Sequence, residues 1–243
     1  MIAGIGGPDP GRHPAPDVPP DIDAALRRAE DATAERRGLA GTGFWAAVSV
    51  VRRDARLAEH YADRIASIDR RAFEQAMRWR VTVGLGNALL LAVTIVGLLA
   101  VGFAYGLEGV PQAIAVLGGT GVLLGSTHAP AHWAVGRLVG IRFTHYFVGG
   151  RPQPGPGAKI DYASYLRTPP RARALMHASG AFVTKLVPFV VSGAAWAMGA
   201  HAAVIWTLLV LGVVQLVSDA ALSTTTSDWM KVRRELGAAR HWS

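Results

Sequence analysis

Four long apolar stretches constrain this chain more than any other feature of its sequence. Each contains about 20 residues or more with few charged side chains or none, and about 20 such residues form a helix that crosses the hydrocarbon core of a bilayer. The sequence therefore predicts an all-α, polytopic membrane protein with about four transmembrane helices. The stretches cover residues 81–105, 110–135, 177–200 and 202–222.

The composition agrees with a membrane protein and narrows the chemistry open to it. The chain is 51% hydrophobic and only 17% charged, with a mean hydropathy of +0.26, which is too apolar for an ordinary soluble domain. It has no cysteine, so disulfides and thiolate ligands are excluded, and a metal site must use His, Asp or Glu. The net charge is +8, but the basic residues flank the apolar stretches and do not alternate with stacking aromatics. We therefore expect lipid headgroups, and no nucleic acid, as partners.

Two regions precede the first span. Residues 1–20 contain six of the 14 prolines and no apolar periodicity, which predicts a disordered tail. Residues 21–78 are expected to form amphipathic helices in the cytoplasm or at the membrane interface. The first of these is a short polar helix within residues 21–37.

The second half of this region carries an amphipathic pattern from Phe44 to Phe73. Its apolar residues recur at helical spacing opposite a basic face. This predicts a helix, or two helices broken near Ser67–Asp69, that lies on the membrane surface and binds anionic lipid. The alternative is a soluble helical hairpin packed on the rest of the protein. The apolar positions are Phe44, Val48, Val51, Tyr61, Ile65, Ile68 and Phe73.

Residues 79–243 form the predicted four-span membrane domain, and positive charges orient it. Basic residues concentrate before the first span, in segment 137–173 and after the fourth span, whereas segment 106–109 carries only Glu108 as a charge. By the positive-inside rule both termini are expected to be cytoplasmic, in a plasma membrane or bacterial inner membrane. The glycine- and proline-rich residues 149–157 predict a turn or an extended segment, without the alternation of a hairpin.

His128 and His132 lie four residues apart near the end of the second span. Residues i and i+4 share a helix face, so both imidazoles can point at one metal ion. Polar side chains are costly inside a span, which makes the pair a candidate functional site. The alternative is that one histidine donates a hydrogen bond to a backbone carbonyl in a packed bundle. Pro130 disfavours the helical conformation at Ala129, so a kink is expected between the histidines.

Carboxylates near the end of the fourth span offer a third ligand. Asp219 and Asp228 fall at a matching depth, and two imidazoles, a carboxylate and an open fourth position are the arrangement of catalytic zinc. Lys185 lies in the third span, where it must snorkel to the surface or pair with one of these carboxylates. If Lys185 faces the site, its charge favours a structural ion-pair cluster over a metal.

These residues resemble the site-2 protease family of intramembrane zinc metalloproteases. In that family a spanning helix carries His-Glu-x-x-His, followed by Gly-Ile and Gly-Gly, and a later span supplies an aspartate ligand. Here residues 128–132 read His-Ala-Pro-Ala-His, and Gly140-Ile141 and Gly149-Gly150 follow. The resemblance covers about residues 110–235 and implies the family's membrane core. The implied zinc ligands are His128, His132 and Asp228, with Asp219 as the alternative.

The chain also departs from the family at its motifs. The family's general base is the glutamate after the first histidine, and Ala129 stands at this position. Without that carboxylate nothing obvious accepts a proton from a metal-bound water. Only Gly180 remains of the family's Gly-Pro-x-x-Asn, because Ala181 and Thr184 occupy the other positions. The family's Leu-Asp-Gly is replaced at residues 227–229 by Ser-Asp-Trp.

The resemblance, with these departures, implies a degenerate and non-catalytic metal-binding scaffold or regulatory subunit that works with other membrane proteins. The alternative is an active intramembrane zinc metalloprotease with another base, such as His145 or Asp219. A di-iron membrane enzyme is disfavoured because it needs about eight clustered histidines, whereas this chain has one His-x-x-x-His and isolated others. A serine hydrolase is disfavoured because no Gly-x-Ser-x-Gly elbow occurs.

Overall fold

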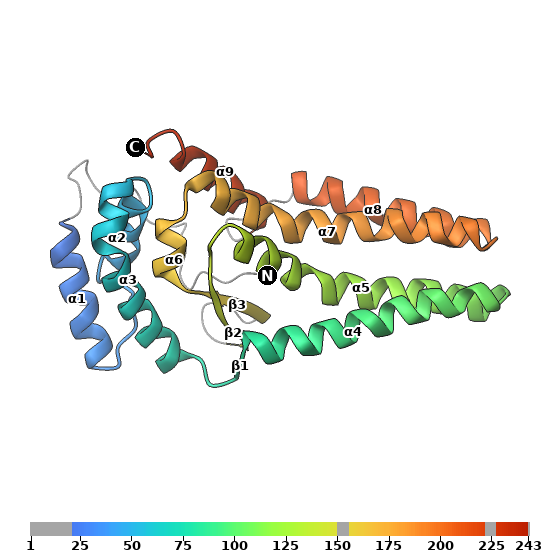
Figure 1. Cartoon of the computed structure of the whole chain (residues 1–243), viewed down its shortest axis with the longest axis horizontal. Helices are drawn as coiled ribbons and strands as arrows, with labels where there is room; N and C mark the ends of the chain where they lie inside the picture. Colours follow the sequence, from blue (N-terminus) through green and yellow to red (C-terminus); the bar gives the residue numbers. More distant parts are fainter. Residues whose placement is uncertain (1–20, 150–155, 222–226, 243) are drawn as a thin grey trace.

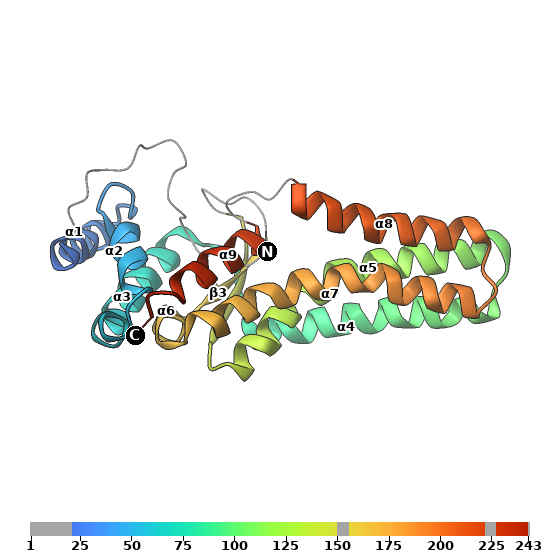
Figure 2. The ribbon, with the colours of Figure 1, turned by 90° about the horizontal axis from the view of Figure 1, so that it is seen from above.

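A computed structural model describes residues 21–149, 156–221 and 227–242 of the chain. The tail predicted over residues 1–20 therefore lies outside the described residues. The molecule is elongated, with four long helices at one end and a smaller group of helices and strands at the other (Figures 1 and 2). We call this smaller group the head. It consists of α6 (Tyr162–Arg167) together with α1, α2, α3, α9 and the three strands, whose bounds are given below.

The four predicted spans are four long helices. They are long and apolar enough to cross a membrane, which confirms the prediction of an all-α polytopic membrane protein. The third helix begins seven residues before the predicted span, because Pro170 is acceptable in the first turn of a helix. The helices are α4 (Val83–Phe103), continued by the 3₁₀ turn η1 (Ala104–Gly106), α5 (Gly109–Leu138), α7 (Pro170–Ala197) and α8 (Ala202–Ala221).

Helix α5 is central to the bundle, since it packs against both α4 and α7, and α8 packs on α7. Close approach of α4 and α5 depends on small residues: a Cβ at Gly119 would lie 2.9 Å from the carbonyl oxygen of Gly97. A buried apolar cluster fills the part of the bundle far from the head. It includes Val101, Val116, Leu123, Val191 and Leu208.

The helices of the head begin and end at clear local signals. Asp21 caps α1 (Ile22–Ala34), and Asp54 caps α3 (Ala55–Ala76), in each case by accepting hydrogen bonds from backbone N–H groups of the first turn. The amphipathic segment is therefore broken at residues 52–54, between α2 (Phe44–Val51) and α3. The break predicted near Ser67–Asp69 is wrong, because the Asp54 cap restarts the helix 15 residues earlier and α3 then continues through that point.

The apolar face of α2 and α3 is buried inside the protein. Phe44 and Ile65 are fully buried and pack in one cluster with Ile141, Leu166 and Met176 from segments that follow the second span. This face is thus not available to the bilayer, and the prediction of a membrane-surface helix is wrong for it. The packed helical hairpin, which was the alternative, is the observed arrangement.

The three strands of the head form an antiparallel sheet next to the spans. Its strands are β1 (Arg80–Thr82), β2 (Phe143–Val148) and β3 (Pro156–Ile160), in the order β1-β2-β3. β2 and β3 pair with each other, a hairpin that the sequence pattern of residues 149–157 did not indicate. Residues 156–157 are extended, as predicted, and residues 150–155 of the predicted turn lie outside the described residues. The pairing was hidden because the β2 side chains from Phe143 to Phe147 are at least partly buried on both faces, which removes the alternation of a half-exposed strand.

A buried ion pair connects α3 to β3. Lys159 forms an ion pair with Asp69, and both side chains are under 5% exposed. The rings of Phe73 and Tyr162 lie 5.0 and 5.5 Å from the Lys159 ammonium. Burial raises the pKa of Asp69 and lowers the pKa of Lys159, against the mutual attraction of the two charges. Each charge therefore depends on its partner.

We predict that Lys159→Ala lowers the free energy of unfolding by about 3–5 kcal/mol, because it leaves a buried carboxylate unpaired. The matched control is Arg167→Ala, which removes the ion pairs of Arg167 with the exposed α3 residues Asp63 and Glu59 and is expected to cost about 1 kcal/mol or less. Thermal unfolding of the detergent-solubilised protein measures both. Equal losses in the two variants would contradict a special role for the buried pair.

Candidate metal centre

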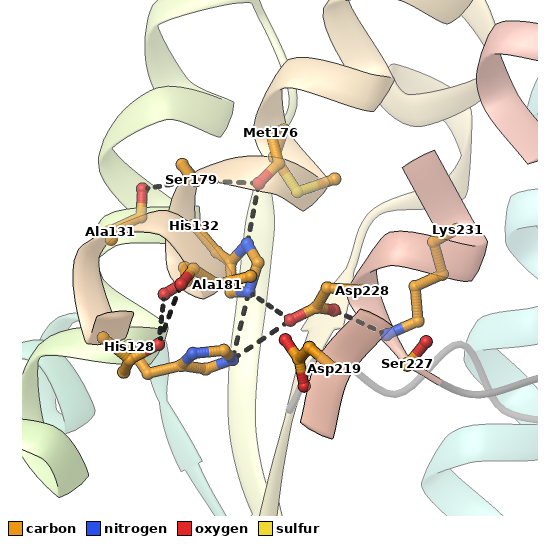
Figure 3. A network of polar contacts seen from close by, with 12 residues as sticks. His128, Ala131, His132, Met176, Ser179, Ala181, Asp219, Ser227, Asp228 and Lys231 are labelled. Carbon is orange, nitrogen blue, oxygen red and sulfur yellow. Dashed lines mark hydrogen bonds and ion pairs between the residues drawn. The ribbon is translucent and has the colours of Figure 1, made fainter. Parts of the chain in front are cut away.

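Three of the sequence-predicted residues meet at the boundary between the bundle and the head. His128 and His132 project from α5, and Asp228 is the first residue of α9 (Asp228–Ala238) (Figure 3). One nitrogen of each histidine and one oxygen of Asp228 lie within 4.8 Å of one another. Asp228, which the sequence placed near the end of the fourth span, begins a separate helix that returns to the end of α5.

Helix α5 is continuous from Gly109 to Leu138 and so passes through Pro130. Proline removes one N–H group, and its ring disturbs the carbonyl four residues earlier, but a helix with packed neighbours tolerates both. The expected kink therefore does not break the helix. The two imidazole rings keep their i, i+4 relation, with centroids 4.7 Å apart.

The three potential ligand atoms form a nearly equilateral triangle. The Nε2 atoms of His128 and His132 are 3.2 Å apart, and they lie 3.3 and 3.2 Å from Oδ2 of Asp228. In a tetrahedral site with metal–ligand bonds of 2.0–2.1 Å, neighbouring ligands stand roughly 3.3–3.4 Å apart. The triangle thus has the dimensions of three corners of a tetrahedral site.

A backbone hydrogen bond fixes the tautomer of His132. Its Nδ1 lies 2.7 Å from the carbonyl oxygen of Met176, and a carbonyl can only accept, so Nδ1 carries the hydrogen. The Nε2 of a neutral His132 then presents a lone pair to the carboxylate of Asp228, and two acceptors 3.2 Å apart need a cation or a further proton between them. Histidines that bind metal commonly donate their other N–H in this way. From the sequence, a hydrogen bond to a carbonyl and a metal site were alternative roles for a histidine. In the structure they use different nitrogens of His132, because Nδ1 donates to the carbonyl and Nε2 is free to bind a metal.

Asp228 is held by groups on its own helix. Ser227 caps α9, accepting a hydrogen bond from the backbone N–H of Met230, and Lys231 donates to Oδ1 of Asp228 at 3.1 Å. This leaves Oδ2 for the histidines. Burial opposes ionisation of Asp228, but its contacts with the His128 and His132 imidazoles and the charge of Lys231 outweigh it and lower its pKa well below the usual range.

Gly180 on α7 makes room for the fully buried ring of His132. A Cβ at this position would lie 2.2 Å from Nε2 of His132. The ring cannot move aside cheaply because its other nitrogen is bonded to Met176, whose carbonyl also accepts a hydrogen bond from Ser179. The glycine at position 180 therefore has a direct steric reason.

Asp219 and Lys185, the other two candidate residues, pair with each other. The ion pair joins α7 to α8, and Lys185 is largely buried. Asp219 is not in the group of three ligands found among the described residues, so of the two predicted carboxylates the structure brings Asp228 to the histidines. The positive charge of Lys185 is balanced by Asp219, whereas the cation that contacts the cluster is Lys231.

Sequence reasoning missed Lys231, and the structure does not bring His145, named as an alternative base, into the three-residue cluster. The three-residue spacing of Asp228 and Lys231 on a helix was a usable signal. His145 lies on β2 and lines a cavity of about 60 Å³ in the head, together with Asp69 and Lys159. Its ring is 6.1 Å from the ring of Phe73, so it belongs to the packing of the head.

No protein-family model, no curated protein and no solved structure matches this chain. The fold and the site define it as a polytopic helical membrane protein with a cluster of two histidines and one aspartate where its spans meet its head. The resemblance to site-2 proteases therefore stays a prediction from the motif residues.

We predict that Gly180→Ala lowers the free energy of unfolding by about 1–3 kcal/mol, because the added methyl group overpacks the ring of His132. Gly193→Ala on the same helix is the matched control: nothing lies within 4 Å of its Cβ, so it is expected to be neutral or slightly stabilising. Thermal unfolding of the two purified variants measures the difference. A Gly180→Ala protein as stable as the control would mean that His132 is not tightly confined.

Proposed function

We propose that this chain is an integral membrane protein that binds one divalent metal ion at His128, His132 and Asp228 and does not cleave peptides. The observation that carries the proposal is the triangle of ligand atoms with sides of 3.2–3.3 Å, together with the tautomer of His132. Zinc is the best match, because nitrogen and oxygen ligands in a tetrahedral arrangement suit it and the chain offers no thiolate.

The proposed role is that of a scaffold or regulatory subunit. Asp228 begins α9, and Glu235, seven residues later on the same helix, is fully buried and contacts Arg173 and Tyr165. With an ion bound, Asp228 and the two histidines would join α9 to α5, while Glu235 joins it to α6 through Tyr165. The metal would thus fix the position of the head, which we propose lies in the cytoplasm with both termini and binds other membrane proteins.

The surroundings of the cluster argue against proteolysis. A metalloprotease needs a positioned base that takes a proton from water and passes it to the leaving amine. Ala129 has no such group, Asp219 is engaged by Lys185, and His145 lies in the cavity of the head. Loss of a general base commonly costs about 10²–10⁴ in rate.

One observation favours the second candidate, an active intramembrane metalloprotease. Three protein ligands leave a fourth tetrahedral position open, and the side chain of His128 is 22% exposed, so a small molecule can reach the site. This function would require Asp219 to leave its ion pair with Lys185 and act as the base.

We predict near-stoichiometric zinc in the detergent-purified protein, and its loss in His128→Ala. Lys231→Met should bind zinc at least tenfold more tightly than the wild type, because the substitution removes a positive charge next to Asp228. His201→Ala, an exposed histidine on the turn before α8, is the control. Metal analysis after dialysis against a weak chelator measures all four proteins. A wild type that is metal-free and cannot be loaded with zinc would overturn the proposal.

We predict no cleavage when the zinc-loaded protein is reconstituted with a transmembrane peptide, since proton transfer lacks its base. Ala129→Glu restores a carboxylate after the first histidine and is the variant most able to gain activity. Mass spectrometry of the peptide detects a cut in either protein. Cleavage by the wild type that disappears in His132→Ala would replace the non-catalytic proposal with the protease.

A further inference from the structure

Two large apolar side chains are exposed on the sheet, outside the four spans. Trp79 is 81% exposed and Val148 is 62% exposed. They are neighbours, because the N–H of Val148 donates to the carbonyl of Trp79 at 3.2 Å and extends the β1–β2 ladder by one residue. Exposed apolar residues that adjoin one another mark an interaction surface more strongly than scattered ones.

The two side chains point away from the core of the head. Successive residues of a strand face opposite sides, and Phe147, next to Val148, is buried against Phe73 with ring centroids 5.2 Å apart. Val148 and its partner Trp79 therefore face outward. They remain uncovered by any described part of the chain.

This surface continues into the lipid-facing side of a span. Trp79 precedes Val83, the first residue of α4, by four positions, and β1 leads directly into that helix (Figure 1). Val81 and Leu85, between and just beyond them, are exposed as well. The patch thus lies at the level where α4 enters the membrane.

Charge identifies which part of the bilayer meets the patch. Arg78 and Arg80 flank Trp79 in the sequence, and both are exposed. Arg80 is the register partner of Phe147, so it leaves the edge strand β1 on the face opposite to Trp79. Tryptophan favours the membrane–water interface, and arginine binds phosphate groups strongly. The phospholipid phosphate is the anion that is abundant at this depth.

We propose that Trp79 and Val148 form an interfacial anchor, inserted among lipid headgroups, and that Arg78 and Arg80 bind the phosphates of anionic phospholipids. The anchor holds the sheet, and through it the head, against the membrane surface. It replaces α2 and α3 as the lipid-binding element, because the apolar face of those helices is buried. The inference does not depend on whether the histidine cluster binds metal.

Spin labels test the depth of the anchor in the full chain reconstituted into phosphatidylglycerol vesicles. The chain has no cysteine, so Trp79→Cys and Val148→Cys each give one labelled site. Relative accessibility to oxygen and to a water-soluble nickel chelate should place both labels between Leu98→Cys, exposed on α4, and Glu59→Cys, exposed on α3. Labels at 79 and 148 as accessible to the chelate as the one at 59 would overturn the anchor.

A charge variant tests the anionic lipid. The wild type should unfold at a higher temperature in phosphatidylglycerol than in phosphatidylcholine vesicles, and the double variant Arg78→Gln/Arg80→Gln should lose at least half of this difference. The control Arg53→Gln/Arg56→Gln removes the same charge from exposed positions at the α2–α3 turn. It should retain the full difference in unfolding temperature between the two lipids. Equal effects of the two double variants would show that only net charge matters and would overturn the assignment of the phosphates to this site.

Discussion

The hydrogen bond from His132 to the carbonyl of Met176 is the interaction on which the arrangement of the site depends. It places one edge of the buried ring against α7 and thereby turns Nε2 toward His128 and Asp228. It is possible only because Gly180, one turn further along α7, has no side chain to fill the space of the imidazole. Packing between two spans and the orientation of a potential ligand are therefore a single constraint, and neither can change without the other.

Helix α9 carries this constraint into the head. Its buried Glu235 lies 3.1 Å from Arg173 and accepts a hydrogen bond from Tyr165, whose hydroxyl also contacts His177 at 3.0 Å. Buried charges of this kind add little net stability, but a displaced partner leaves an unpaired charge in an apolar interior. The network therefore selects one position of α9, and with it the position of Asp228, more than it strengthens the fold.

Sequence was sufficient where one physical requirement acts alone. The length of an apolar stretch determines a span, and the spacing of His128 and His132 determines a shared helix face. Neither prediction depends on which other residues pack nearby. Sequence was insufficient where the partner matters. The amphipathic segment from Phe44 to Phe73 has the same pattern whether lipid or protein covers it, and only the long-range packing shows that protein does. The sheet was missed because β2 is at least partly buried on both faces from Phe143 to Phe147. Lys231 was missed because Asp228 was treated as the end of the fourth span, and a helix that begins at Asp228 was not considered.

The charges around the cluster limit what it can hold. Asp228 with Lys231, and Asp219 with Lys185, are two neutral pairs, so a divalent ion at the three ligands would bring two positive charges with no carboxylate left to balance them in that group. At the edge of a low-dielectric membrane such an excess weakens binding. An anion in the open fourth position would remove part of the excess, and a carboxylate from a second protein is one way to supply it. If the proposed ion binds, the same shortage of carboxylates that leaves the site without a general base also leaves this excess charge to be balanced from outside the three ligands.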